Sequence, residues 1–194
     1  MYMKRALVLI GVSSFLICTI MSCAAWGDSL GYLNKNIKIK KVKKVVYFNP
    51  LVTPEIPEIY VPTYNAFYSA ASDFLKDKNS GKIIRVDCIM NYDYVDTEYV
   101  KEICLNNNAE VALIPKVKYF KVGFGRYVFS NQVLVSAKLY DAEGNFIIET
   151  SYDTYKGNAR LLGNAENSVK IGTIGMLRKM SKEIRRYKLN SEVL

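Results

Sequence analysis

Histidine is absent from the 194-residue sequence. Histidine is the usual general base near neutral pH, the usual partner of a nucleophilic serine or cysteine, and a common ligand of catalytic zinc. Its absence therefore excludes most hydrolase and metalloenzyme mechanisms. A carboxylate-based hydrolase stays open in principle, and it would need Asp87, Asp93 or Glu110 to converge in one cleft. No acidic pair stands out at strand ends, so we expect a protein that is not an enzyme.

Cysteine is scarce as well, and none of the four cysteines forms the C-x-x-C spacing typical of redox and zinc sites. Cys18 and Cys23 lie in an apolar segment near the N-terminus. Cys88 is expected at the end of a strand and Cys104 in the helix that follows. A disulfide between Cys88 and Cys104 is geometrically feasible, and burial as two small apolar side chains is the alternative. The sequence leaves both open.

Sequence patterns for cofactors and metals are also missing. The segment 123–125, Gly-Phe-Gly, joins strand to strand, whereas a phosphate-binding loop leads into a helix N-terminus. Asp93, Asp96 and Glu98 are close in sequence but lack the glycine and ligand spacing of a calcium loop. Helix capping by Asp96 or Thr97 explains them more simply. We expect neither a metal nor a cofactor.

The only long apolar run, residues 6–21, follows Lys4 and Arg5 and is interrupted by glycine, serine and threonine. It is marginal for a membrane span, which needs about 20 apolar residues, and its length and flanks favour a secretory leader. Its end, Ile-Met-Ser-Cys at 20–23, resembles the signal of bacterial lipoproteins, in which the cysteine is acylated and becomes the first residue. The resemblance implies a leader at 1–22 and lipidation of Cys23. Cleavage after Ala24 and an uncleaved anchor are the alternatives.

Several acyl chains on Cys23 would anchor the protein stably to a membrane. The residues that follow Cys23 contain no acidic run and no aspartate in second place, which favours an outer-membrane protein that faces the periplasm. The net charge of +9 is concentrated at 35–44 and 170–188. Basic clusters attract phosphate-rich partners, but an exported protein meets no nucleic acid. Anionic lipid, lipopolysaccharide or an acidic protein surface remains as a partner, and solvated strand and helix faces are the simplest interpretation.

Downstream of the leader we expect a flexible tether at 23–36 and a single domain at 37–190. Its first half predicts a strand at 37–48, an extended loop at 49–62 because proline opposes helix and ladder pairing, and a helix capped by Thr63. A strand at 82–89 and a helix ending near Asn108 follow. Its second half predicts a meander with strands at 110–122, 126–140 and 145–155, and a helix at 164–188. This order, β-α-β-α-β-β-β-α, predicts an α+β fold with helices packed on a mixed sheet.

Two segments of the domain, Asn108–Ile114 and Val133–Gly144, carry an alanine-acid-apolar strand and a strand that ends in D-x-x-G. They resemble elements of a group of envelope lipoproteins that includes the curli-secretion lipoprotein, the penicillin-binding-protein activator lipoproteins and the N-terminal domain of the Tol translocation protein. The resemblance implies a non-catalytic periplasmic module that binds or scaffolds other envelope proteins. The resemblance gives no indication of the oligomeric state.

Candidate contact residues come from the chain itself. Ile56, Ile59 and Tyr60 lie on the proline-rich segment, and Phe124 and Arg126 lie at the tip of the first hairpin of the meander. The alternative function is a lipoprotein that binds a lipid or glycan, which would contain a deep apolar or tyrosine-lined pocket that a scaffold lacks.

Overall fold

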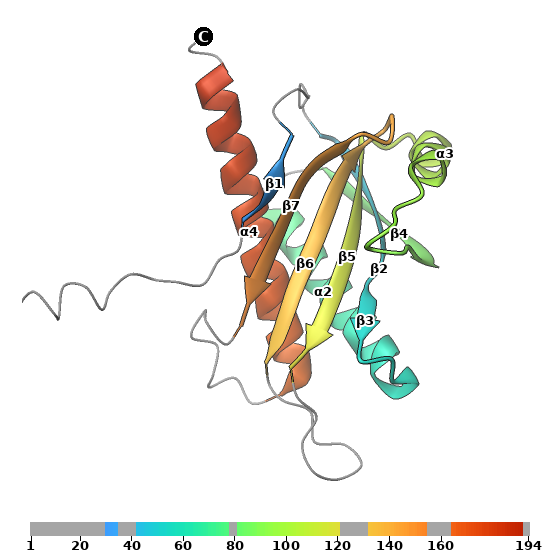
Figure 1. The fold of residues 1–194 in the computed structure, drawn as a ribbon, viewed down its shortest axis with the longest axis vertical. Coiled ribbons are helices and arrows are strands. Elements are labelled where there is room, and N and C mark those ends of the chain that lie inside the picture. Colours follow the sequence, from blue (N-terminus) through green and yellow to red (C-terminus); the bar gives the residue numbers. More distant parts are fainter. Residues whose placement is uncertain (1–29, 35–41, 78–80, 121–131, 155–163, 192–194) are drawn as a thin grey trace, which may run out of the picture.

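A seven-stranded mixed sheet forms the centre of the structure, a computed structural model, and helices α2 and α4 lie behind its strands in the view of Figure 1. The structure describes residues 30–34, 42–77, 81–120, 132–154 and 164–191. The strands are β1 Leu30–Leu33, β2 Lys44–Asn49, β3 Leu51–Thr53, β4 Lys82–Ile89, β5 Val111–Tyr119, β6 Val133–Asp141 and β7 Phe146–Asp153. The helices are α2 Pro57–Asp77, α3 Thr97–Asn107 and α4 Ala165–Ser191. The α+β fold predicted from the sequence is confirmed.

The strand order is β1-β7-β6-β5-β2-β4, with β3 paired to β5. β2 runs parallel to both β4 and β5, because α2 and α3 return the chain to the same end of the sheet. β5, β6 and β7 form the predicted antiparallel meander. The turn between β6 and β7 uses Gly144 at φ +81°, and the Asp141 carboxylate accepts a 2.7 Å hydrogen bond from the backbone N–H of Asn145.

β2 and β3 together form one interrupted strand beside β5. Tyr47 pairs with Leu113 and Leu51 pairs with Lys116, so three residues on the β2–β3 side face two residues on β5. Pro50 and Pro115 both lie at this interruption. A proline donates no backbone hydrogen bond, and the β5–β6 ladder continues across Pro115. The hydrogen bond that Pro115 cannot donate is therefore missing on the side of β5 that faces β2. The extra residue between β2 and β3 lets the pairing with β5 resume beyond this point.

The extended loop predicted at 49–62 is wrong. Residues 51–53 form β3, and α2 begins at Pro57 and contains Pro62. The first N–H groups of a helix have no partner inside it, so Pro57 loses nothing, and Pro62 lies on the exposed side. Thr63, predicted as the cap of this helix, is buried within it, and its hydroxyl lies 2.7 Å from the Tyr119 hydroxyl.

The segment at 30–33, predicted as part of a tether, forms β1 and pairs with β7. The folded part of the chain therefore includes residues that precede the expected boundary at 37. Four residues carry no recognisable period, and they become a strand because β7 offers an open edge.

The helix boundaries predicted in the other segments agree well with the structure. Asp96 caps α3 by accepting a 3.0 Å hydrogen bond from the N–H of Tyr99, and Asn108 ends the helix in the left-handed conformation. α4 extends from 165 to 191, close to the predicted range. The buried face of α4 includes Val169, Met176 and Met180.

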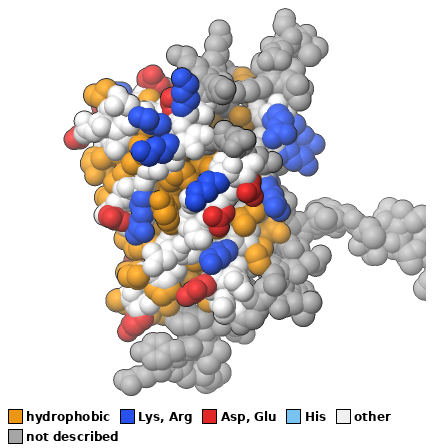
Figure 2. Space-filling model, turned by 180° about the vertical axis from the view of Figure 1, so that it is seen from behind, with side chains coloured by type: hydrophobic (Ala, Val, Ile, Leu, Met, Phe, Trp, Pro, Cys, Tyr) orange, Lys and Arg blue, Asp and Glu red, His pale blue; other side chains and the backbone are white. Residues whose placement is uncertain are grey.

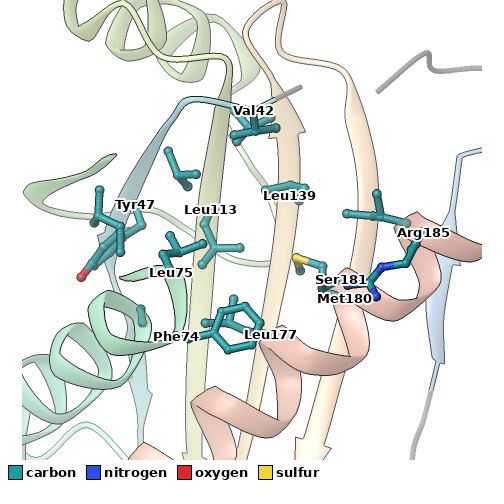
Figure 3. A pocket seen from close by; sticks show the side chains of 15 residues that line it. Val42, Tyr47, Phe74, Leu75, Leu113, Leu139, Leu177, Met180, Ser181 and Arg185 are labelled. Carbon is teal, nitrogen blue, oxygen red and sulfur yellow. The ribbon is translucent and has the colours of Figure 1, made fainter. Parts of the chain in front are cut away.

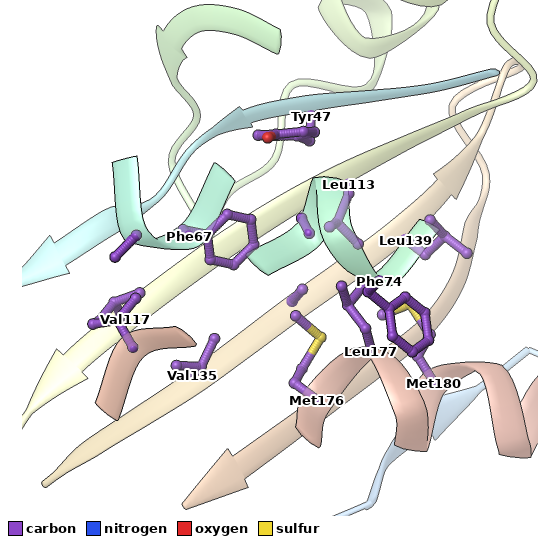
Figure 4. Packing of buried hydrophobic residues seen from close by; sticks show 14 of the residues in the cluster. Tyr47, Phe67, Phe74, Leu113, Val117, Val135, Leu139, Met176, Leu177 and Met180 are labelled. Atoms are coloured by element: carbon purple, nitrogen blue, oxygen red, sulfur yellow. The ribbon is translucent and has the colours of Figure 1, made fainter. Parts of the chain in front are cut away.

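The two faces of the sheet are covered differently. α2 and α4 bury Phe67, Phe74 and Met176 against β5 and β6, as Figure 4 shows. The opposite face carries a smaller cluster in which Val100 and Cys104 of α3 pack on β2 and β5. The larger core therefore lies between the sheet and the two long helices.

Candidate functional site

A pocket of about 420 Å³ lies between α2, α4 and the sheet (Figure 3). Its lining is almost entirely aliphatic or aromatic, and it draws on both helices and on four strands. The lining residues are Val42, Val45, Tyr47, Ala71, Phe74, Leu75, Ile83, Val111, Leu113, Leu139, Leu177, Met180, Ser181, Ile184 and Arg185.

The pocket lies beneath the C-terminal half of α4, and two glycines explain why. A Cβ atom on Gly172 would lie 2.5 Å from a methyl carbon of Val135, and one on Gly175 would lie 2.5 Å from the Tyr152 ring. Such separations are shorter than van der Waals contact, so the absence of a side chain at these two positions lets α4 approach β6 and β7 closely. Beyond Gly175 the helix carries Met180 and Ile184, which line the pocket.

The pocket extends from the core to the surface. Val111, Leu113 and Leu139 are among its buried walls, whereas Val45 and Ile184 are only half-buried. In Figure 3 the side chains of Leu113 and Leu139 lie above Leu177 and Met180, on the sheet and the helix respectively. An apolar group that entered would therefore be covered from both layers.

Tyr47 is the one aromatic polar side chain in the lining. Its ring packs against Phe67 and Tyr68 at centroid distances of 5.9 and 5.4 Å. Its hydroxyl is buried and has no hydrogen-bond partner among the described residues. Burial raises the pKa of Tyr47 well above its ordinary value, so the side chain stays neutral.

The other polar side chains of the lining are at its edge. Ser181 is half-buried and Arg185 is exposed. Figure 3 shows the guanidinium end of Arg185 beside Ser181 and close to Met180. No hydrogen bond or ion pair of Arg185 occurs within the part of the chain that the structure describes, whereas its neighbour Arg186 pairs with Glu183 at 3.3 Å. Figure 2, which views the molecule from behind, shows hydrophobic patches interspersed with lysine and arginine side chains.

The structure places the predicted contact residues differently. Ile59 is a core residue with 7% of its surface exposed, and Ile56 and Tyr60 pack partly buried against the same core. They do not form the exposed extended surface that we expected, because this segment is a strand, a short turn and a helix. Ile59 also borders a second cavity of about 340 Å³ between α2 and α4. Phe124, Arg126 and Cys23 lie outside the described residues.

Cys88 and Cys104 are free thiols in this structure. Cys104 is buried in the smaller core, and burial raises the pKa of its thiol to about 11. Cys88 is half-buried at the end of β4, and its sulfur lies 3.6 Å from the backbone oxygen of Ile89. Of the two predicted alternatives for Cys104, burial as a small apolar side chain is the one observed.

The acidic residues considered for catalysis each have a different local partner. Asp87 pairs with Arg85 and Asp93 with Lys116. Glu110 accepts hydrogen bonds from the backbone N–H groups of residues 43 and 44, and these bonds lower its pKa. Within the described ranges no three acidic or cysteine side chains lie close enough to hold a metal.

The fold and the pocket define an α+β domain with an apolar cavity between its sheet and two helices. None of the described helices has the length and apolar character to cross a bilayer. No protein-family model and no curated protein sequence matches the chain.

The PelC fold is nevertheless similar to the fold of this chain. The PelC dodecamer from Paraburkholderia phytofirmans is similar at a TM-score of 0.50 and 12% identity, over 77% of this chain and 94% of that chain. The lipoprotein GNA1162 from Neisseria meningitidis matches at 0.37 and 12%, over 74% and 99% of the two chains. A neuraminyllactose-binding hemagglutinin homolog from Helicobacter pylori matches at 0.37 and 14%, over 84% and 99%.

Proposed function

We propose that this protein is a lipid-anchored, non-catalytic binding protein of the bacterial cell envelope, and that its domain holds an apolar ligand in the pocket between α2, α4 and the sheet. The observation that carries the proposal is the pocket itself, of about 420 Å³ and lined almost wholly by apolar side chains.

Protein interiors are normally close-packed and contain few voids larger than a water molecule. Binding sites for small molecules are the main exception, at about 300–1,000 Å³ with mostly apolar walls and a few polar groups. The pocket has this size, and Ser181 and Arg185 are the polar groups at its edge. An apolar pocket also distinguishes the two functions that the sequence left open, since a scaffold does not require one.

The envelope location rests on the signal at 20–23 and on Cys23 as the lipidated residue. Intact-mass measurement of the purified protein tests this part. We expect a chain that begins at Cys23 and carries acyl chains. A chain that begins at Met1 with a free thiol at Cys23 would remove the anchor.

Binding of a neutral apolar fluorophore such as N-phenyl-1-naphthylamine tests the pocket. Ser181→Phe places a bulky ring at the mouth and should reduce binding at least tenfold. Lys182→Phe is the matched control, because Lys182 is the next residue of α4, is exposed and does not line the pocket. Equal binding by both variants would place the fluorophore elsewhere and contradict the proposal.

Scaffolding through self-association is the second candidate. β4 lies at one edge of the sheet, and its eight residues pair only with β2 among the described strands. An unpaired edge strand is a template for pairing with another chain. Ile89 at its end is 46% exposed and Tyr94 is 85% exposed. The similar structure of PelC is a dodecamer.

Sedimentation of the purified protein tests this candidate. Self-association that weakens when Ile89 and Tyr94 are both replaced by lysine would support it. A monomer at every concentration would exclude it.

A further inference from the structure

We infer that the ligand of the pocket is a single-chain anionic amphiphile, a fatty acid, whose chain lies among the aliphatic walls and whose carboxylate meets Arg185. This inference rests on the proposed function, because it names the class of molecule that the same pocket would bind. It is argued from the volume of the pocket, the chemistry of its walls and the charge at its mouth.

The volume of the pocket favours a ligand with a single alkyl chain. A pocket of about 420 Å³ lies near the lower end of the range for small-molecule sites, about 300–1,000 Å³, and this favours one alkyl chain over two. A two-chain phospholipid would leave most of its second chain in water.

The walls select an aliphatic ligand over a sugar. Apart from Tyr47, Ser181 and Arg185, the lining side chains have no hydrogen-bonding group. A glycan would leave its hydroxyl groups unpaired in such a site, which is strongly unfavourable. An alkyl chain has no such group, and each methylene that it buries strengthens binding about fourfold.

The charge at the edge of the pocket favours a ligand with a negative head group. Arg185 lines the pocket and has no partner within the described part of the chain, so its guanidinium is available to a ligand. A guanidinium binds a carboxylate with two parallel hydrogen bonds. Glu183 is already paired with Arg186. Glu110, the residue before Val111 of the lining, is held by the backbone N–H groups of residues 43 and 44.

Ser181 adds a hydroxyl next to this guanidinium. The two residues are four positions apart on α4, so their side chains lie on the same side of the helix. Figure 3 shows them together at the edge of the apolar side chains. A carboxylate at this point would contact both groups while its chain extended toward Leu113 and Leu139.

Photolabelling in isolated membranes that contain the full chain tests the inference. Two probes carry the same chain of about twelve carbons with a terminal diazirine, one ending in a carboxylate and the other in a neutral alcohol. Labelled peptides are mapped by mass spectrometry. We expect the acid to label the pocket segments of α2 and α4, and to do so at about tenfold lower concentration than the alcohol.

Arg185→Gln should raise the half-saturating concentration of the acid about tenfold and that of the alcohol less than twofold. Arg186→Gln is the matched control, because Arg186 is adjacent, pairs with Glu183 and does not line the pocket. It should change neither probe. Acids of increasing chain length should compete about fourfold better per carbon and then level off once the chain is longer than the pocket.

The outcomes separate this inference from the proposed function. Equal labelling of the pocket by acid and alcohol, unchanged in Arg185→Gln, would overturn the anionic ligand while leaving an apolar binding site. Labelling by a diazirine phosphatidylglycerol but not by the acid would overturn the single chain. Absence of label from the pocket with every probe would overturn the proposed function itself.

Discussion

Replacing Tyr47 by phenylalanine is expected to raise the free energy of unfolding, whereas the same change at most buried tyrosines lowers it. The Tyr47 hydroxyl is buried and has no partner among the described residues. A buried polar group without a hydrogen bond costs about 1–3 kcal/mol relative to its hydrated state in the unfolded chain. Tyr47→Phe removes this cost and keeps the ring contacts with Phe67 and Tyr68. We expect a gain of about 1–2 kcal/mol.

Tyr119 is the matched comparison in the same core. Its hydroxyl lies 2.7 Å from the Thr63 hydroxyl, and both groups are buried. Tyr119→Phe leaves Thr63 without this partner and should lower the free energy of unfolding by about 1–2 kcal/mol. The two substitutions remove the same atom, so differences in unfolded-state hydration cancel between them.

Urea unfolding monitored by circular dichroism measures both changes. The wild type, Tyr47→Phe and Tyr119→Phe should share one denaturant slope and differ only in midpoint. Melting temperatures should shift in opposite directions, by about 2–4 °C for each kcal/mol in a domain of this size. A loss of stability in Tyr47→Phe as large as that in Tyr119→Phe would refute the reasoning.

Three further changes follow from the described contacts. Gly172→Ala should lower the free energy of unfolding by about 1 kcal/mol, because the new Cβ would lie 2.5 Å from a methyl carbon of Val135. This loss is expected although alanine favours helices over glycine. A variant that is more stable in urea unfolding would contradict the close approach of α4 to the sheet. Asp96→Ala should cost about 1 kcal/mol by removing the cap of α3, measurable as a lower melting temperature, and an unchanged temperature would argue against that cap. Burial raises the pKa of Tyr47, Tyr92 and Tyr119, because it disfavours the charged form of each side chain. The contribution of these three groups to the free energy of unfolding is therefore complete below about pH 10, the ordinary pKa of tyrosine, and is lost as the pH rises further. Urea midpoints that stay constant from about pH 9 to about pH 11 would count against this burial.

The sequence predicted the elements whose signals are local. The helix at 164–188, the strands of the meander and the cap at Asp96 each depend on residues within a few positions of one another. The proline-rich segment misled the prediction, because proline is unfavourable in a helix interior but tolerated at the first helical position, and the sequence does not say where a helix begins. β1 was missed because its pairing with β7 is a tertiary contact.

The pocket was not predictable for a related reason. Its lining comes from positions between 42 and 185, with no spacing that links them. Phe74, Leu75 and Leu177 lie at helical spacing in the sequence, and nothing in their pattern distinguishes a filled core from an open one. The contacts of Gly172 and Gly175 with β6 and β7 set the distance between α4 and the sheet, and they become visible only in the folded chain.

Nuclear magnetic resonance of methyl-labelled protein during titration with dodecanoate tests the central claim most directly. Binding in the pocket predicts that shifts concentrate on the methyl groups of Leu113, Leu139, Leu177 and Ile184, which line it. The methyl groups of Val46, Val100 and Ile114, which belong to the smaller core on the opposite face, should remain unchanged. Shifts confined to that opposite face, or absent throughout, would contradict the assignment of the pocket as the binding site.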